Sequence, residues 1–182
     1  MTPSLLPVTC RADILPIYRQ TPISLLLEYQ NCGRPFDSYV MAKLLVGMCM
    51  DNRKVLRIPD NFAYILRAGG ANLRRAEFKV SFAISIGGVR ALALIAHDQC
   101  GMVGLTARRE VFIQGLVAHA GWTAENAARH FDERAPEFEI ADAGEFVCTE
   151  AQRLRRDYPK LVIAPLFYRV DEGKLYQLQE CG

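Results

Sequence analysis

The stretch RALALIAHDQCG, residues 90–101, is the most direct indication of the fold class. Residues 90–96 form an almost wholly apolar run, which is typical of a strand buried on both faces of a parallel sheet. His97 and Cys100 follow where this strand ends. Because parallel α/β sheets bind ligands beyond the carboxyl ends of their strands, this position favours a functional site. Taken alone, an H-x-x-C pair is more typical of a core histidine and a buried thiol than of a functional site. Further motifs elsewhere in the chain are therefore needed to predict a site.

Two more strands are predicted upstream. The run KLLVGM, residues 43–48, is short and mostly apolar, and Cys49 follows it. The run NFAYIL, residues 61–66, contains aromatic and β-branched side chains and stops at Arg67-Ala68-Gly69-Gly70, where the glycines permit a tight turn. Cys49, this turn and His97 all lie at strand ends. We therefore expect them to converge at one edge of the sheet.

Helical patterns fill the chain between and beyond these strands. Phe78, Phe82 and Ile86 recur at helical spacing and predict an amphipathic crossover helix over residues 76–86, with these side chains on its apolar face. Further helices are expected over 106–119, over 123–135 and from Asp142 to the stop at Asp157-Tyr158-Pro159, with strands over 161–170 and 174–178. The alternation of strands and helices predicts an α/β fold with a mainly parallel central sheet flanked by helices.

Length and composition restrict the class of protein. The chain has 182 residues, of which 51% are apolar and 23% are charged, as expected for one globular domain over residues 1–182. A net charge of only +2 argues against nucleic acid as a partner. The N-terminus lacks the basic segment and apolar run of a secretory signal, and no apolar run reaches the roughly 18 residues of a membrane span. We therefore expect a cytoplasmic protein that does not contact a membrane.

The cysteines fall into two groups. Six cysteines are present, and their spacing is not that of a small disulfide-rich secreted domain. Those at positions 10, 32, 148 and 181 have no accompanying motif and are interpreted as core or incidental residues. Cys49 is different, because it opens the run CMDNR, residues 49–53, which adds the Asp51 carboxylate and the Arg53 guanidinium at alternate positions.

The two motifs together supply a metal donor set. Cys49, His97 and Cys100 offer two thiolates and one imidazole, a recognised zinc set that leaves one of four tetrahedral positions open. An open position is typical of a catalytic zinc ion, whereas Asp51 as a permanent fourth ligand would make a closed structural site. The residues also allow a third interpretation, in which both thiols are inert core groups and Asp51 forms a surface ion pair with Arg53.

With both motifs in view, the sequence resembles the β-class carbonic anhydrases. The resemblance rests on Cys49-x-Asp51-x-Arg53 and, after 43 intervening residues, on His97-x-x-Cys100-Gly101, with a glycine turn between the two motifs. That turn reads Leu66-Arg67-Ala68-Gly69 where the family usually has Arg-Asn-Ala-Gly. The resemblance extends to YPKLVIAPLFYRVDEGKLYQL, residues 158–178, and so covers most of the chain from about residue 40. Residues 1–38 match poorly and are expected to form an N-terminal arm or helical segment.

The resemblance implies a role for each residue of the two motifs. Cys49, His97 and Cys100 are expected to hold a zinc ion, Zn²⁺. Asp51 and Arg53 are expected to form a catalytic dyad over the fourth zinc position, and Asp51 is a possible fourth ligand in a closed state of the site.

The resemblance also implies an activity and an assembly. The expected reaction is the reversible hydration of carbon dioxide to bicarbonate by zinc-bound hydroxide, in a substrate pocket lined by Arg67, Gly69 and Gly70. A homodimer or an assembly of dimers is expected. The alternatives are a hydrolase of COS or CS₂ that uses the same zinc site, and a non-catalytic protein that binds zinc and bicarbonate.

Overall fold

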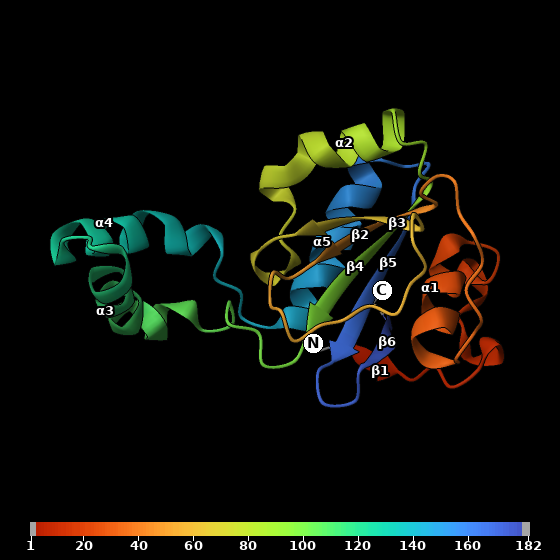
Figure 1. The fold of residues 1–182 in the computed structure, drawn as a ribbon, viewed down its shortest axis with the longest axis horizontal. Coiled ribbons are helices and arrows are strands. Elements are labelled where there is room, and N and C mark those ends of the chain that lie inside the picture. The colour runs from red at the N-terminus through yellow and green to blue at the C-terminus, as the bar shows by residue number, and fades with distance from the viewer. Residues whose placement is uncertain (1–2, 180–182) are drawn as a thin grey trace.

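The structure, a computed structural model, describes residues 3–179, which form a six-stranded sheet with helices on both faces (Figure 1). The strands lie in the order β1-β6-β5-β4-β2-β3. Strands β3, β2, β4 and β5 are parallel, whereas β6 is antiparallel to β5 and β1 is antiparallel to β6. The bounds are β1 Ser4–Leu6, β2 Leu44–Met48, β3 Ala63–Arg67, β4 Ala91–His97, β5 Val162–Arg169 and β6 Lys174–Gln179.

The predicted α/β fold with a mainly parallel sheet is confirmed. The five strands expected from the sequence correspond to β2 to β6, with small shifts at their ends. The interpretation of Cys181 as an incidental residue concerns a position outside the described residues.

Strand pairing brings the two sequence motifs together. Strands β2 and β4 are adjacent and parallel, with Met48 beside Ile95, and every residue of both strands is buried. Cys49 is the first residue after β2, and His97 is the last residue of β4. Their backbones therefore leave the sheet at the same edge, which is the edge where the sequence predicts a site.

Alternate side chains of the central strands enter two cores on opposite faces of the sheet. On one face, residues such as Leu45 pack with the helices α2, Glu77–Ser85, and α5, Ala143–Asp157. On the other face, residues such as Val46 pack with α1, Pro22–Asn31. The sheet is covered on both sides, so the carboxyl edge of its parallel strands is the place where chemically useful side chains can meet a ligand.

The helix predicted over 76–86 is present as α2, but it buries a different face from the predicted one. Val80 and Ala83 are buried, whereas Phe78, Phe82 and Ile86 are 82%, 49% and 74% exposed. The prediction of the apolar face was therefore wrong. Helix α2 carries apolar residues on two sides, and helical spacing alone does not indicate which side meets the sheet.

The N-terminal segment packs against the central sheet of the same chain. Helix α1 begins at Thr21, whose hydroxyl accepts a hydrogen bond from the Ile23 amide at 3.2 Å, and Pro22 occupies its first turn. Strand β1 pairs with the outer side of β6, with Leu5 beside Leu178. Strand β1 was not predicted, because three residues are too short to show a periodic pattern.

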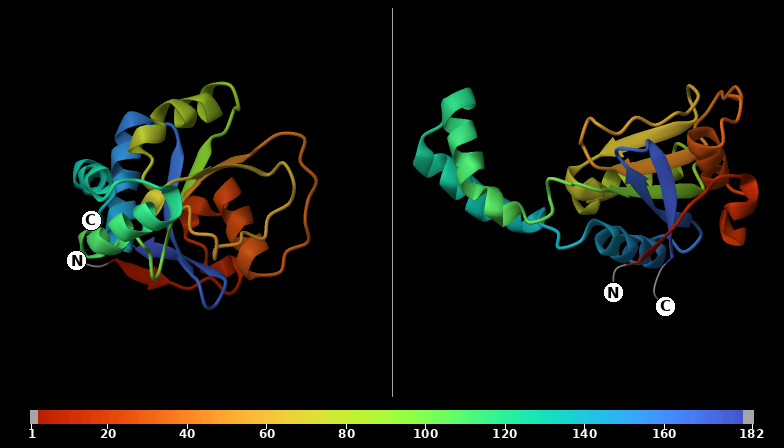
Figure 2. Two further views of the ribbon diagram at one scale, coloured as in Figure 1. Left: turned by 60° about the vertical axis from the view of Figure 1, so that its left-hand side comes forward. Right: turned by 90° about the horizontal axis from the view of Figure 1, so that it is seen from below.

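Residues 105–137 form an arm that projects away from the sheet (Figures 1 and 2). The arm contains helix α3, Arg109–Ala120, and helix α4, Ala124–Arg134, as the sequence predicts, with a short 3₁₀ turn at each base. Arg109 joins the two helices through hydrogen bonds of 2.7 and 2.8 Å to the two carboxylate oxygens of Asp132. The expected helix from Asp142 is present as α5. Within residues 3–179, no helix combines the length and apolar character needed to cross a bilayer.

Candidate metal centre

Three buried side chains meet at the carboxyl edge of the sheet. Cys49, His97 and Cys100 are 3%, 1% and 5% exposed, and one ligand atom from each lies within 4.8 Å of the other two. The two Sγ atoms are 4.0 Å apart. Two sulfurs bound to one tetrahedral zinc ion at about 2.3 Å each would lie about 3.8 Å apart. The separation observed therefore fits two ligands of one metal ion.

The histidine supports a metal site independently. Both ring nitrogens of His97 are buried, and neither makes a hydrogen bond to the described residues. A buried imidazole nitrogen without a partner costs free energy, and a metal ion bound to one nitrogen would remove part of that cost. The residues present thus fit a metal ion held by two thiolates and one imidazole.

The two thiols affect each other's protonation. Cys100 lies within hydrogen-bonding distance of Cys49, so the pKa of Cys49 falls well below its usual range while the same contact, together with burial, raises the pKa of Cys100. The Gly70 amide also donates to the Cys49 sulfur, at 3.4 Å. Gly70 has a φ of +62°, a left-handed conformation that glycine adopts without strain, and this conformation aims its amide at the sulfur.

Asp51 and Arg53 form a close ion pair beside the three ligands. The Nη2 atom of Arg53 lies 2.7 Å from one Asp51 carboxylate oxygen, and its Nε atom lies 3.1 Å from the other. These hydrogen bonds hold the pKa of Asp51 well below its usual range. Among the described residues, the Asp51 carboxylate does not belong to the group of three ligand atoms. The carboxylate is therefore held by Arg53 and lies outside the candidate ligand group.

Gln99 is a site residue that sequence reasoning missed. Its side-chain oxygen accepts a hydrogen bond from Arg53 Nη1 at 2.9 Å, and its backbone oxygen accepts one from Arg53 Nη2 at 3.1 Å. Gln99 also has a φ of +53°, which is uncommon for a residue other than glycine. Its position between His97 and Cys100 was the only sequence signal.

Lys54 is a second residue that the sequence did not indicate. Its side chain is fully buried, and Nζ donates to the backbone oxygen of Asp51 at 3.1 Å. Burial lowers the pKa of Lys54, while the nearby groups of Cys49, Asp51 and Cys100 act in the opposite direction. The structure thus places a buried amine close to the candidate metal ligands.

The three residues predicted to line the substrate pocket, Arg67, Gly69 and Gly70, make different contacts. Arg67 donates from Nη1 to the backbone oxygens of Cys49 and Asp51, at 3.3 and 3.2 Å, and from Nη2 to that of Lys54, at 3.3 Å. Its guanidinium therefore fixes the loop that carries the first motif. Gly69 lines an apolar cavity, and Gly70 contacts a metal ligand as described above.

The apolar cavity lies between the first motif and the arm. It has a volume of about 290 Å³, and its lining is mostly apolar. The residues that line it are Met50, Gly69, Met102, Leu105, Phe112, His130, Phe131, Arg134, Ala135 and Phe138. Met50 directly follows Cys49 in the sequence, and Gly69 directly precedes Gly70. The cavity thus reaches the loop that follows Cys49 and the glycine turn.

Solved structures that are similar to this chain include carbonic anhydrases and a carbon disulfide hydrolase. The chain is similar to a β-carbonic anhydrase from Trichomonas vaginalis, with a TM-score of 0.64 and 16% identity over 80% of this chain and 88% of that one. It is similar to a carbonic anhydrase from Glaciozyma antarctica, with a TM-score of 0.61 and 23% identity over 76% and 84% of the two chains. The chain has the β-carbonic anhydrase fold. The resemblance seen in the sequence is thereby confirmed at the level of the fold.

The β-carbonic anhydrase fold is not restricted to one named activity. A carbon disulfide hydrolase is also similar, with a TM-score of 0.55 and 19% identity over 77% of this chain and 80% of that one. The sequence matches no protein-family model, and no curated protein matches it significantly. The geometry of the site therefore has to distinguish carbon dioxide hydration from carbon disulfide hydrolysis.

Proposed function

We propose that this protein is a zinc enzyme that reversibly hydrates carbon dioxide to bicarbonate. The proposal rests on one observation, the buried group of Cys49, His97 and Cys100 beside an Asp51 carboxylate that is held by Arg53. A zinc ion in this group would supply the Lewis acidity that makes a water molecule nucleophilic near neutral pH. The metal ligands, the dyad and the zinc ion are all part of this proposal.

Asp51 orients the nucleophile in the proposed reaction. Its carboxylate accepts a hydrogen bond from the attacking water and so directs a lone pair toward the carbon of the substrate. This task requires an ionised carboxylate in a fixed position. Arg53 provides both conditions, because its hydrogen bonds lower the pKa of Asp51 and hold both carboxylate oxygens.

Arg53 also controls access to the metal in this proposal. The Asp51 carboxylate is two residues from Cys49, so a released carboxylate can reach the metal and close the fourth position. The Arg53 side chain is 41% exposed and can therefore leave Asp51 without disturbing the core. An intact pair corresponds to the open site, and a broken pair corresponds to the closed one.

The apolar cavity favours a second candidate function, the hydrolysis of COS or CS₂. These linear molecules are apolar, and the sulfur compounds are larger than carbon dioxide. A cavity with side chains such as Met50, Met102 and Phe138 suits them, and a carbon disulfide hydrolase shares the fold. A Cβ added at Gly69 would lie 2.9 Å from the Met102 sulfur, so Gly69→Ala would narrow the cavity. We expect this variant to lose CS₂ turnover more strongly than CO₂ turnover.

We further propose a homodimer or an assembly of dimers, in the cytoplasm. The free, exposed thiols of Cys10 and Cys32 suit a reducing compartment. The substrates of the proposed reaction, carbon dioxide and bicarbonate, are small and need no further partner.

Metal content and turnover test these proposals together. We expect one zinc per chain and turnover of CO₂ in the wild-type protein. Cys100→Ser should lose both the metal and the activity, whereas Cys32→Ser, which alters an exposed thiol away from the site, should keep both. Full zinc content in Cys100→Ser would contradict the ligand assignment. A zinc-loaded protein with no turnover of CO₂, COS or CS₂ would instead support a non-catalytic zinc-binding protein.

A further inference from the structure

The loop that carries the first motif has no regular structure of its own. Between Met48, the end of β2, and Ala63, the start of β3, the described chain contains no helix or strand. The course of such a backbone depends on the side chains and neighbouring segments that satisfy its polar groups. This loop carries Cys49 and Asp51, which the proposed reaction needs in fixed positions. The residues that hold the loop are therefore candidates for a role in that reaction.

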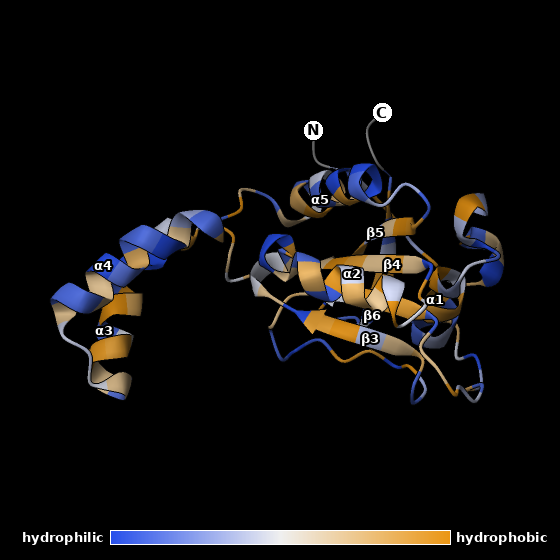
Figure 3. Ribbon diagram, turned by 90° about the horizontal axis from the view of Figure 1, so that it is seen from above, coloured by the Kyte–Doolittle hydropathy of each residue, from blue (hydrophilic) through white to orange (hydrophobic). Residues whose placement is uncertain are grey.

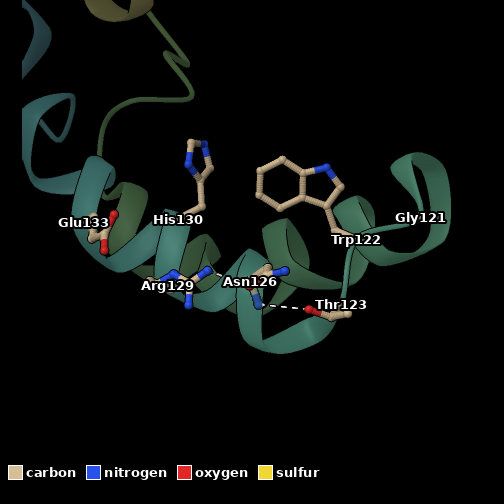
Figure 4. Close-up of a pocket in the computed structure, with 7 residues that line it drawn as sticks. All are labelled: Gly121, Trp122, Thr123, Asn126, Arg129, His130 and Glu133. Carbon is tan, nitrogen blue, oxygen red and sulfur yellow. Dashed lines mark hydrogen bonds between the residues drawn. The ribbon is translucent and has the colours of Figure 1, made fainter.

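The groove on the arm takes no part in holding this loop. Figure 4 shows the groove with the side chains of Trp122 and His130 projecting over it from the turn and from α4. All the residues that line it lie within residues 121–133, so it contains no residue of either motif. The loop is held from another direction, by the sheet.

Arg67 reaches the loop from the end of strand β3. Figure 3 shows β3, an edge strand, with most of its length in the hydrophobic colours, and Arg67 is its last and only charged residue. In the sheet, Arg67 lies beside Met48, which directly precedes Cys49. The Ala68 amide donates to the Met48 oxygen at 3.0 Å. The backbone of Arg67 is thus fixed by the sheet at the point where the loop begins.

The Arg67 guanidinium binds three backbone carbonyls of the loop. Nη1 donates to the oxygens of Cys49 and Asp51 at 3.3 and 3.2 Å, and Nη2 donates to the oxygen of Lys54 at 3.3 Å. A guanidinium is a planar fork with five N–H donors, so one side chain can serve several acceptors. The Lys54 amine donates to the same Asp51 oxygen, at 3.1 Å. The carbonyls of positions 49, 51 and 54 are thereby gathered around one side chain, which sets the curvature of the loop.

The two side chains that the reaction needs follow the course of this backbone. The Gly70 amide donates to the Cys49 sulfur at 3.4 Å, while Arg67 binds the backbone oxygen of the same cysteine. The Arg53 amide donates to the Asp51 carboxylate at 2.9 Å, so the position of that carboxylate depends on the backbone of residues 51–53. A shift of the loop would therefore displace both the Cys49 sulfur and the Asp51 carboxylate.

We propose that Arg67 is a positioning residue, which acts through the backbone of residues 49–54 and not by contact with the substrate. The effect on turnover rests on the proposed function. The resemblance in sequence implies that Arg67 lines the substrate pocket, whereas its three carbonyl contacts commit both Nη atoms to the loop. Because a displacement of about 1 Å can cost about 100-fold in rate, an arginine that holds the loop contributes to the reaction without meeting the substrate.

Arg67→Lys separates a positioning role from a role of charge or of substrate binding. Lysine keeps the positive charge, but one ammonium group cannot serve three carbonyls as the fork does. We expect kcat to fall by about tenfold or more with little change in KM. The matched control is Arg90→Lys, because Arg90 also binds two backbone oxygens, those of Ile84 and Val89, but lies at the opposite end of β4 from the site. A normal kcat in Arg67→Lys, or a higher KM at unchanged kcat, would overturn the proposal.

Hydrogen exchange of the metal-free protein tests the loop without any turnover. In Arg67→Lys we expect the amides of residues 49–55 to exchange about fivefold faster than in the wild type, with unchanged exchange in α1 as evidence of an intact fold. Equal exchange over residues 49–55 in an active enzyme would overturn the role of Arg67 alone. Faster exchange in a zinc-loaded protein without turnover would overturn the proposed function, and with it the kinetic role of Arg67.

A soluble guanidinium distinguishes the shape of the Arg67 side chain from its charge. Arg67 lines a cleft of about 470 Å³ together with Met50, Asn52 and Lys54, so removal of its side chain leaves an opening that a small cation can enter. In Arg67→Ala we expect methylguanidinium to restore part of the lost kcat and methylammonium, which carries the same charge, to restore less. An equal response to the two cations would show that charge alone matters and would overturn the proposal.

Discussion

The guanidinium of Arg53 binds both oxygens of Gln99, the side-chain oxygen at 2.9 Å and the backbone oxygen at 3.1 Å, although the two residues are 46 positions apart. Arg53 belongs to the first motif, and Gln99 lies between the two ligands of the second. The same guanidinium holds Asp51. Through Arg53, the loop after β4 therefore determines where the Asp51 carboxylate lies, and we infer that Gln99 is a positioning residue for the proposed reaction.

Gln99→Gly should lower CO₂ turnover without unfolding the protein. Glycine suits the φ of +53° at this position, so the backbone keeps its shape while one hydrogen bond to Arg53 is lost. A hydrogen bond to a charged group is worth about 1.5 kcal/mol or more, which corresponds to about a tenfold loss of turnover. Asn61→Gly is the matched control, because Asn61 also has a positive φ of 60° and lies in a different loop. Equal activity of the two variants would contradict the role of Gln99.

Arg53→Ala should keep zinc but lose turnover, by about a hundredfold or more if the dyad positions the nucleophile. The released Asp51 carboxylate should then bind the metal and close the fourth position. Asp51→Ala should also lose turnover, yet its fourth position should hold water or a small anion. X-ray absorption at the zinc edge, or crystals of both variants, would distinguish the two coordination shells. An open zinc site with near-normal CO₂ hydration in Arg53→Ala would exclude the gating role.

Lys54→Met should shift the activity profile toward higher pH. The buried amine of Lys54 lies near Cys49, Asp51 and Cys100, and its positive charge favours deprotonation of a neighbouring nucleophile. Removing that charge should raise the pH of half-maximal turnover by about one unit. The control is Lys43→Met, which removes an exposed lysine. A profile that stays in place would mean that Lys54 has only a packing role.

Asp13 should stabilise the fold above its ordinary pKa and lose this effect in acid. Its carboxylate accepts hydrogen bonds from the Thr9 hydroxyl at 2.6 Å, the Thr9 amide at 2.8 Å and the Cys10 amide at 3.0 Å, which lower its pKa from 3.8 to about 2. A carboxylate with a lowered pKa in the folded state contributes stability that is fully present above its unfolded pKa and disappears as the pH falls through the folded value. Urea unfolding should therefore show Asp13→Asn less stable than the wild type at pH 6, with the difference shrinking between pH 3.8 and about pH 2. A difference that does not change over this range would contradict the prediction.

Local patterns in the sequence predict strands β2 to β6 and the position of the candidate ligands. Apolar runs of strand length, each followed by a polar or sulfur side chain, were enough to predict β2 and β4 and to place Cys49 and His97 at their ends. These features are local or follow from the parallel geometry of the sheet. For the same reason the Asp51 and Arg53 pair, two residues apart, could be expected from spacing alone.

Which surfaces are covered depends on tertiary packing. Spacing identified helix α2 but assigned its buried face to Phe78 and Phe82, because a helix with apolar residues on two sides has no local feature that selects one of them. The contacts of Gln99 and Lys54 join loops that are distant in sequence or fold back on themselves, so no pattern marks them. The projection of the arm, with Trp122 exposed at its turn, likewise depends on how the chain leaves the sheet after Cys100. Burial is a property of what packs opposite a residue, and only the folded chain supplies that neighbour.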